Sequence, residues 1–287
     1  MNTVDPIYSE DFCLVAEAML KDEPVHNWKN YPCSKYALVS RSQNNIFLKC
    51  FLPRSFLERF KSMLRGSRCA RSARGSELLL SAGLYAPKNI AQGQVGEVEW
   101  LAARAADGAG FGDLLAYLTT YDHPKISLLI QSMLVALGKQ IGKMHQQLIV
   151  HGDLRPNNIM VSFRNRRTQK KENIIALSSL DYIEPVFTYI DNERTRRYWL
   201  RIPNRERRRN LIQIMMIANS AISSKQRSLF FSAYFNCFEN KRDSVRLEQK
   251  VRDIVDGRLE RKGYNRSFAL ICEDAKKRVI KALELVS

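Results

Sequence analysis

Residues 151 to 160 read HGDLRPNNIM and directly follow a long, largely apolar segment. Asp153 and Asn158 are five residues apart. On an α-helix this step turns about 140°, which would point the two side chains in different directions. A loop, in contrast, can aim both side chains at one target. The sequence therefore predicts a loop that brings a carboxylate and an amide together.

Charge is the most unusual global property of the chain. Its 287 residues include 46 Lys and Arg against 29 Asp and Glu, which gives a formal net charge of +17. Such a charge attracts polyanions: nucleic acid, an anionic membrane surface or a phosphorylated substrate. The length is sufficient for two lobes or domains.

The cysteines and the N-terminus indicate a reducing compartment. Six cysteines are scattered without a C-x-x-C pair, which favours neither a zinc cluster nor a disulfide framework. The N-terminus is acidic and lacks the pattern of a secretory signal. The apolar segment 126 to 138 is shorter than the ~20 residues that span a bilayer. We expect a cytoplasmic protein, either soluble or peripheral to the membrane.

The segments before the loop predict a β-rich region. Residues 36 to 51 contain two β-rich runs around a polar RSQNN turn, with Lys49 in the second run. Residues 56 to 83 predict one or two helices, and residues 94 to 104 predict a further strand pair. The glycine-rich stretch 106 to 113 then has the composition of a connection between two lobes.

The segments around and after the loop predict a mainly helical region. Apolar residues three or four apart predict a core-facing helix between 125 and 150; these are Ile126, Leu129, Met133, Leu137, Ile141, Met144 and Leu148. Residues 158 to 163 and 173 to 182 are strand candidates on either side of a basic turn. The remainder, after Asp181, is predicted to be helical.

The chain resembles the protein-kinase superfamily in the order of its features. These are a strand lysine, a helix, a glycine-rich connection, a long helix, HGDLRPNN, two strands and an aspartate. The loop differs from H-R-D-L-K-P-x-N mainly in Gly152 and Arg155. The resemblance implies an α+β, bilobal protein-kinase-like fold. A small β-rich N-lobe would occupy residues 1 to 105, and a larger helical C-lobe would occupy residues 106 to 287.

The resemblance also implies a phosphotransferase that uses ATP and Mg²⁺. Asp153 would be the catalytic base, and Arg155 would steady the transferred phosphate. Asn158 and Asp181 would bind Mg²⁺, and Lys49 would contact the α- and β-phosphates of ATP.

Two further assignments concern supporting residues. Glu77 has the chemistry to pair with Lys49, but another alignment places Ser72 at that position. His151 is expected to pack beneath the loop as a structural residue and not to carry a proton.

The chain also departs from ordinary protein kinases. No glycine occurs between Met1 and Arg65, so the glycine-rich phosphate cover is absent and the nucleotide must be held in another way. Asp181 is followed by Tyr and Ile, and no A-P-E follows. Gly152 replaces the cation that would bind a phosphorylated activation segment. These departures keep a noncatalytic kinase-like binding module open as an alternative.

Residues 46 to 87 are similar to the small lobe of bacterial lipopolysaccharide-core kinases, the Kdo and heptose kinases. The shared features are the strand lysine, a basic amphipathic segment at 54 to 65, an S-R-x-x-R helix at 67 to 71 and a turn from Gly83 to Pro87. The resemblance covers roughly residues 40 to 220. It implies phosphorylation of a sugar hydroxyl on a lipopolysaccharide core intermediate, an anionic glycolipid, at the cytoplasmic membrane face.

Two basic segments suit an anionic partner, and each has a structural alternative. Residues 54 to 65 alternate basic and bulky apolar side chains, which would lie at an anionic membrane surface or pack on the small lobe. Residues 194 to 209 contain eight arginines and one glutamate, which would bind a phosphate-rich substrate or form a solvated face.

Other acceptors are alternatives within the same fold. A protein Ser/Thr or a small molecule could accept the phosphate, although the positive charge of the chain disfavours cationic antibiotics. A nucleic-acid partner is disfavoured, because the sequence has no RNP-like aromatic string and no zinc knuckle.

Overall fold

The computed structural model describes residues 6–53, 65–172, 174–176, 180, 182–238, 244–261, 268–280 and 284–286. The chain divides into two compact units that are discontinuous in sequence. The first unit comprises Met1–Ser81, Ala86–Ala106 and Asp191–Thr195. The second comprises Ala82–Tyr85, Asp107–Ile190 and Arg196–Ser287. The division is therefore less simple than the two continuous lobes predicted from the sequence.

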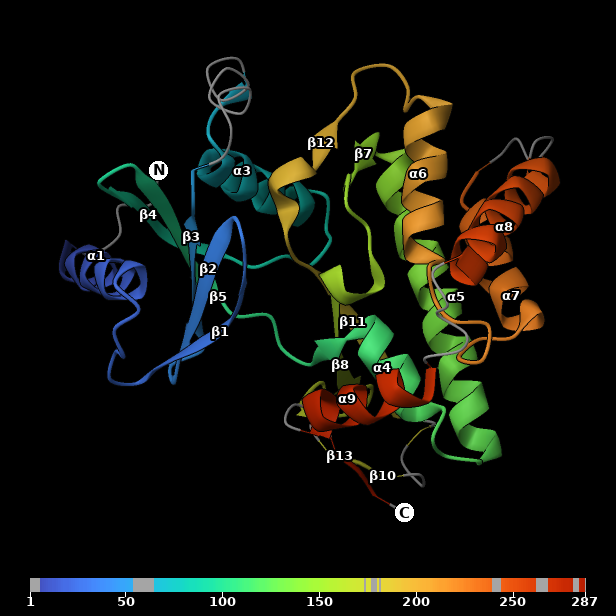
Figure 1. Cartoon of the computed structure of the whole chain (residues 1–287). Coiled ribbons are helices and arrows are strands. Elements are labelled where there is room, and N and C mark those ends of the chain that lie inside the picture. The colour runs from blue at the N-terminus through green and yellow to red at the C-terminus, as the bar shows by residue number, and fades with distance from the viewer. Residues whose placement is uncertain are drawn as a thin grey trace. The chain divides into compact units, whose positions relative to one another are not determined.

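The first unit is built on a five-stranded antiparallel sheet (Figure 1). The strands lie in the order β1-β2-β3-β5-β4, with bounds β1 Trp28–Ser34, β2 Ala37–Ser42, β3 Ile46–Phe51, β4 Asn89–Val95 and β5 Val98–Arg104. The helical elements described here are α1 Pro6–Leu20, α3 Arg68–Ser81 and η3 Asn192–Arg194. The hairpin predicted at residues 36 to 51 is confirmed as β2 and β3.

The two faces of β3 have different surroundings, because successive side chains of a strand point to opposite faces. Leu48 and Cys50 are fully buried in a core with Phe12 and Trp100, whose rings are 5.9 Å apart. Phe51 belongs instead to the apolar cluster that includes residues of α3. Lys49 alternates with Leu48 and Cys50, so it lies on the α3 face of the sheet.

The second unit is mainly helical, with short sheets between the helices. Its helices are α4 Phe111–Leu118, α5 Pro124–Gln146, α6 Asn204–Ile214, α7 Ser224–Phe235, α8 Ser244–Arg261, α9 Phe268–Ile280 and the 3-10 turn η1 Pro156–Asn158. Its strands are β6 Ala109–Gly110, β7 Ile149–Val150, β8 Ile159–Asn165, β9 Lys171–Glu172, β10 Ile174–Ala176, β11 Ile183–Tyr189, β12 Arg196–Arg197 and β13 Glu284–Val286. Within these described segments, no helix is both long and apolar enough to cross a membrane.

The long apolar helix is confirmed as α5. Its predicted core positions from Ile126 to Met144 are all buried. Pro124 begins the helix, and the preceding His123 side chain accepts a hydrogen bond from Lys125 N. The helix ends before Leu148, which has a φ of 62° and therefore cannot continue it.

The strand pair that follows the loop differs from the prediction. β8 pairs with β11 in antiparallel register, from Ile159 opposite Tyr189 to Asn165 opposite Ile183. Residues 174–176 form β10, which pairs with β13 instead. β11 lies at the end of its sheet, a position that tolerates Pro185. The expectation that only helices follow Asp181 is therefore wrong.

Helices α5 and α7 approach closely at Gly138. A Cβ at this position would lie 2.5 Å from the carbonyl oxygen of Phe230. A glycine in α8, Gly257, has nothing within 4 Å of the position its Cβ would take. The two glycines therefore have opposite packing environments.

Replacing Gly138 by alanine should lower the free energy of unfolding by about 1 to 3 kcal/mol, because the new methyl group would press on the backbone of α7. Gly257→Ala is the matched control and should raise the free energy of unfolding by roughly 0.5 to 1 kcal/mol through helix propensity. Urea titration measures both. Equal effects of the two substitutions would contradict this packing.

Candidate active site

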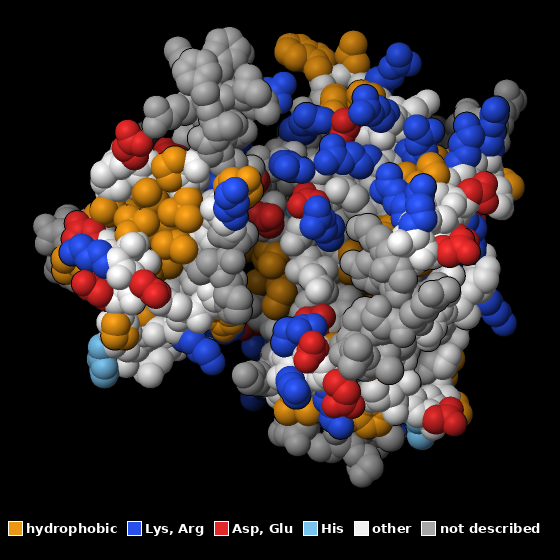
Figure 2. Space-filling model, viewed as in Figure 1, with side chains coloured by type: hydrophobic (Ala, Val, Ile, Leu, Met, Phe, Trp, Pro, Cys, Tyr) orange, Lys and Arg blue, Asp and Glu red, His pale blue; other side chains and the backbone are white. Residues whose placement is uncertain are grey.

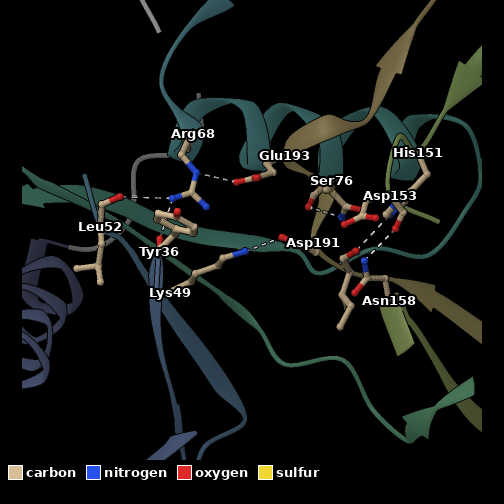
Figure 3. Close-up of polar contacts among 12 residues, drawn as sticks. Tyr36, Lys49, Leu52, Arg68, Ser76, His151, Asp153, Asn158, Asp191 and Glu193 are labelled. Atoms are coloured by element: carbon tan, nitrogen blue, oxygen red, sulfur yellow. Dashed lines mark hydrogen bonds and ion pairs between the residues drawn. The ribbon is translucent and has the colours of Figure 1, made fainter. Parts of the chain in front are cut away.

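The loop from His151 to Asn158 is closed by hydrogen bonds within the second unit (Figure 3). Asn158 Nδ2 donates to the carbonyl oxygen of Asp153 at 2.9 Å. Arg155 N donates to the same oxygen at 2.9 Å, and Gly152 has a φ of 78°, which favours glycine. The loop thus brings residues 153 and 158 together. Because Asn158 uses its amide nitrogen here, its Oδ1 is left to act as an acceptor or metal ligand.

The Asp153 carboxylate is held by two donors. Gln213 Nε2 donates to Asp153 Oδ1 at 3.1 Å, and Arg155 Nε lies 3.0 Å from the same oxygen. The Asp153 side chain is 14% exposed, whereas that of Arg155 is 68% exposed. Gln213 Oε1 also accepts a hydrogen bond from Leu154 N at 3.1 Å. One amide side chain on α6 therefore fixes both the carboxylate and the backbone of the loop.

Sequence reasoning did not identify Gln213 or its neighbour Asn210, one helical turn earlier. The available signal was polar amides in the otherwise apolar segment NLIQIMM, residues 210 to 216. Asn210 is fully buried and lies within a chain of hydrogen bonds that runs through the second unit.

This chain of hydrogen bonds links three helices to the loop. Asn210 Oδ1 lies 3.3 Å from both His151 N and His145 Nε2. Because an amide oxygen only accepts, His145 Nε2 carries the proton and Nδ1 accepts from Tyr234 Oη at 2.9 Å. Arg207 Nε donates to the same tyrosine oxygen at 2.7 Å. Burial lowers the pKa of His145 to about 4; the Asn210 hydrogen bond opposes this shift, and the Arg207 charge adds to it.

The His151 side chain is fully buried beneath the loop. Its Nε2 lies 3.1 Å from the carbonyl oxygen of Ile190, so this nitrogen donates. Ile190 N in turn donates to the carbonyl oxygen of Asn158 at 2.9 Å. These contacts agree with the structural role predicted for His151, and they tie the loop to the residue that follows β11.

In the first unit, Lys49 forms an ion pair with Asp191. The Lys49 Nζ and Asp191 Oδ1 atoms are 2.6 Å apart, and the two side chains are 20% and 36% exposed (Figure 3). Asp191 has a φ of 61°, in the left-handed region that aspartate tolerates better than most residues. Lys49 therefore has a carboxylate partner that comes from a distant part of the sequence.

Helix α3 holds the segment that follows Asp191. Asn192 Nδ2 donates to Ser76 Oγ at 2.9 Å, and Arg68 Nε lies 3.0 Å from Glu193 Oε2. A Cβ on Gly75 would lie 2.1 Å from the carbonyl oxygen of Asn192. Only glycine at position 75 allows this approach of the helix to residues 191–194.

The partner predicted for Lys49 is corrected by these contacts. Glu77 is exposed, and its Oε1 accepts from Asn89 Nδ2 at 3.5 Å. Lys49 pairs with Asp191, so the Lys49–Glu77 pair is not formed in this structure. The alternative residue, Ser72, is buried on α3.

Asp181 lies outside the described residues, as do residues 54–64 of the first basic segment. The metal role predicted for Asp181 depended on its following the second strand of the antiparallel pair that comes after the loop. That strand is β11, and the first carboxylate after it is Asp191. The metal role of Asp181 therefore stays a prediction, and Asp191 is a second candidate for it because it follows β11.

Asn158 in the second unit and Asp191 in the first unit each offer an oxygen atom of the type that Mg²⁺ prefers. Within the described ranges, no group of three or more His, Cys, Asp or Glu could hold a metal ion. Mg²⁺ bound with a nucleotide needs only one or two carboxylates, because phosphates and water complete its coordination. The residues present thus fit Mg²⁺ that arrives with ATP better than a metal held by protein alone.

Comparisons with known proteins identify a family and a fold. Residues 45–234 match the model of the lipopolysaccharide kinase (Kdo/WaaP) family. A solved structure described as WaaP in complex with acyl carrier protein is similar, with a TM-score of 0.57 and 15% identity over 89% of this chain and 98% of that chain. An aminoglycoside-3'-phosphotransferase of type VIII has a TM-score of 0.42, with 13% identity over 84% of this chain and 97% of that chain. No curated protein matches the sequence significantly. The α+β, protein-kinase-like fold predicted from the sequence is confirmed.

The neutral state of His145 should make stability depend on pH. The pKa of His145 is about 4 in the folded protein, and the ordinary value is 6.5, so below pH 6.5 the unfolded chain binds the proton more readily. Stability is thus lost as the pH falls, by about 2 kcal/mol between pH 7 and pH 5. Urea titrations at both pH values test this. His145→Gln cannot titrate there and should show a smaller loss; an equal loss would exclude His145 as the cause.

Replacing Gln213 by methionine should reduce phosphoryl transfer by about 10²-fold, because Asp153 and the loop backbone would lose their shared donor and acceptor. The loss is expected in kcat, with little change in KM for ATP, since Gln213 positions Asp153 and does not bind nucleotide. Gln249→Met on α8 is the control, because Gln249 is exposed and donates a hydrogen bond to Asp253. A rise in KM with unchanged kcat would contradict a positioning role.

Proposed function

Because the chain belongs to the lipopolysaccharide kinase (Kdo/WaaP) family, we propose that it transfers a phosphoryl group from ATP to a sugar hydroxyl of a lipopolysaccharide core intermediate. Membership makes it a phosphotransferase that acts on an alcohol group. The proposal adds the core sugar as acceptor, Mg²⁺ as the metal and the cytoplasmic membrane face as the place of reaction.

The observation that carries the proposal is the fixed Asp153 carboxylate. Both of its donors meet Oδ1, which leaves Oδ2 to orient the acceptor hydroxyl and to take its proton as the new O–P bond forms. Arg155 lies beside this carboxylate, and its exposed guanidinium would hold the transferred phosphate through charged hydrogen bonds.

We assign the nucleotide and metal roles residue by residue. Lys49 would contact the α- and β-phosphates of ATP, and Asn158 would offer its Oδ1 to Mg²⁺. Asp191 would take the metal role predicted for Asp181, because it follows β11 and already pairs with the lysine. When bound, Mg²⁺ would neutralise the charge that develops on the phosphates.

The anionic acceptor is supported by charge. A net charge of +17 attracts a phosphorylated glycolipid and raises its rate of encounter. The same charge provides no comparable attraction for a neutral or cationic acceptor, so the protein Ser/Thr and small-molecule alternatives lack a supporting observation in this chain.

Purified protein with labelled ATP, Mg²⁺ and core glycolipid should transfer phosphate to the glycolipid. Asp153→Asn should lower the rate by about 10² to 10⁴-fold, because an amide cannot accept the proton. Asp191→Asn should raise the Mg²⁺ concentration needed for half-maximal activity, and Asp181→Asn is its matched control. Loss of Mg²⁺ response in Asp181→Asn alone would return the metal role to Asp181.

The acceptor requires a separate measurement. Mass spectrometry of core glycolipid from cells with and without the intact gene should show one phosphate fewer when the gene is lost. An unchanged phosphate count would exclude this acceptor while leaving the phosphotransferase assignment in place.

A further inference from the structure

The connection between β12 and α6 carries the most exposed large apolar side chains of the described residues. Trp199 is 92% exposed and Leu200 is 84% exposed, whereas Trp100 is 1% exposed. Trp199 and Leu200 are called the apolar tip below. Two adjacent apolar side chains of this size would be stabilised if they were removed from water. Their exposure therefore indicates a surface that contacts something outside the chain.

Cations surround the apolar tip. Five arginines between residues 196 and 209 are exposed: Arg196, Arg197, Arg201, Arg205 and Arg209. Glu206 is the one acidic residue in this segment, and it pairs with Arg196 at 3.2 Å. Figure 2 shows Lys and Arg side chains gathered over β12 and α6, with hydrophobic atoms projecting at the upper edge of this region. The surface therefore combines an apolar end with an excess of positive charge.

The apolar tip is attached firmly to the elements that hold the catalytic loop. β12 pairs with β7, with Arg196 opposite Val150, and Tyr198 N donates to the carbonyl oxygen of Leu148 at 2.8 Å. Val150 directly precedes His151. On its other side the tip leads into α6, which carries Gln213. Whatever binds the tip is consequently held in a defined position relative to the Asp153 loop, within one unit.

We propose that Trp199 and Leu200 insert into the headgroup region of an anionic membrane, with the neighbouring arginines on the lipid phosphates. Tryptophan is suited to this interface because its ring is apolar and its N–H is polar, and cationic residues gain from the negative surface. A bilayer also accepts a projecting side chain without a complementary shape, unlike a folded partner. The argument rests on the proposed function in one respect, because a glycolipid acceptor is itself anchored in a membrane.

Vesicle sedimentation tests the proposal. The full chain should bind vesicles of phosphatidylglycerol and phosphatidylethanolamine, and it should bind phosphatidylcholine vesicles much more weakly. Since a chain of +17 adsorbs to anionic surfaces by charge alone, the decisive variant is Trp199→Ser with Leu200→Ser, which keeps every arginine. We expect its affinity for the anionic vesicles to fall about tenfold or more. Val245→Ser is the matched control, because Val245 is 78% exposed on α8, and it should bind like the wild type.

Quenching separates insertion from adsorption. Brominated phosphatidylglycerol should quench the fluorescence of the wild type, and Trp199→Phe should bind the vesicles while losing most of this quenching. Undiminished binding by the double variant, absence of wild-type binding, or equal quenching in Trp199→Phe would overturn the proposal. The proposal would also be overturned if the wild type binds an acidic protein, and the double variant loses that binding while it still binds vesicles. That result would identify a protein-docking surface.

Failure of the membrane proposal can be distinguished from failure of the proposed function. Vesicle binding needs neither ATP nor transfer, so Asp153→Asn should bind vesicles as the wild type does while its transfer rate falls. If vesicles bind through the apolar tip but core glycolipid is never phosphorylated, the acceptor is wrong and the membrane element stands. If glycolipid is phosphorylated and the tip variants bind vesicles normally, the proposed acceptor stands and the membrane role of the apolar tip is wrong.

Discussion

The loop from His151 to Asn158 lies between two strands, and its backbone groups must find hydrogen-bond partners outside a sheet. Two amide side chains of α6 meet this demand: Asn210 accepts from His151 N, and Gln213 accepts from Leu154 N. Because both are neutral, they satisfy buried donors without the desolvation cost of a second carboxylate beside Asp153. The geometry of the loop then depends on the position of α6, and the hydrogen bonds among Arg207, Tyr234 and His145 fix that helix against α5 and α7. Packing of three helices thus determines where one carboxylate points.

The first unit must bury charge in a different way. Arg68 and Glu193 form an ion pair whose side chains are only 8% and 10% exposed, and Arg68 also donates to the carbonyl oxygen of Tyr36 at 2.8 Å. A buried pair is tolerated when its remaining donors are satisfied, as they are here. The pair holds the segment that contains Asp191 against α3, and glycine at position 75 lets the two backbones approach. Since Asp191 supplies the carboxylate for Lys49, this arrangement needs no glutamate from the helix.

Elements whose pattern is complete within one segment were predicted correctly from the sequence, whereas a strand that depends on pairing with a distant segment was misplaced. The loop, the strand of Lys49 and helix α5 each have a pattern complete within one segment, and each lies where it was predicted. The apolar, β-rich composition of residues 173–182 predicts the second strand there, whereas the strand that pairs with β8 is β11, which contains Pro185. The edge position of β11 makes the proline acceptable, but this position is known only from the folded sheet and not from the local sequence. Gln213 was missed for a related reason, since only the folded chain shows which loop a lone amide faces.

The positive charge of the chain does not act as one surface. Arg227 is buried and donates to the carbonyl oxygens of Met215 and Ile217, which satisfies the end of α6; burial lowers its pKa to about 10, so it stays charged at neutral pH. Arg68 and Arg207 are likewise committed to internal contacts. Arginines of this kind stabilise the fold and cannot attract a polyanion at close range. The excess that a partner can meet is therefore smaller than the total of +17, and among the residues that the structure describes the exposed arginines gather around the β12–α6 connection. Net charge predicts an anionic partner, whereas the burial of individual arginines shows which of the described ones remain exposed to meet it.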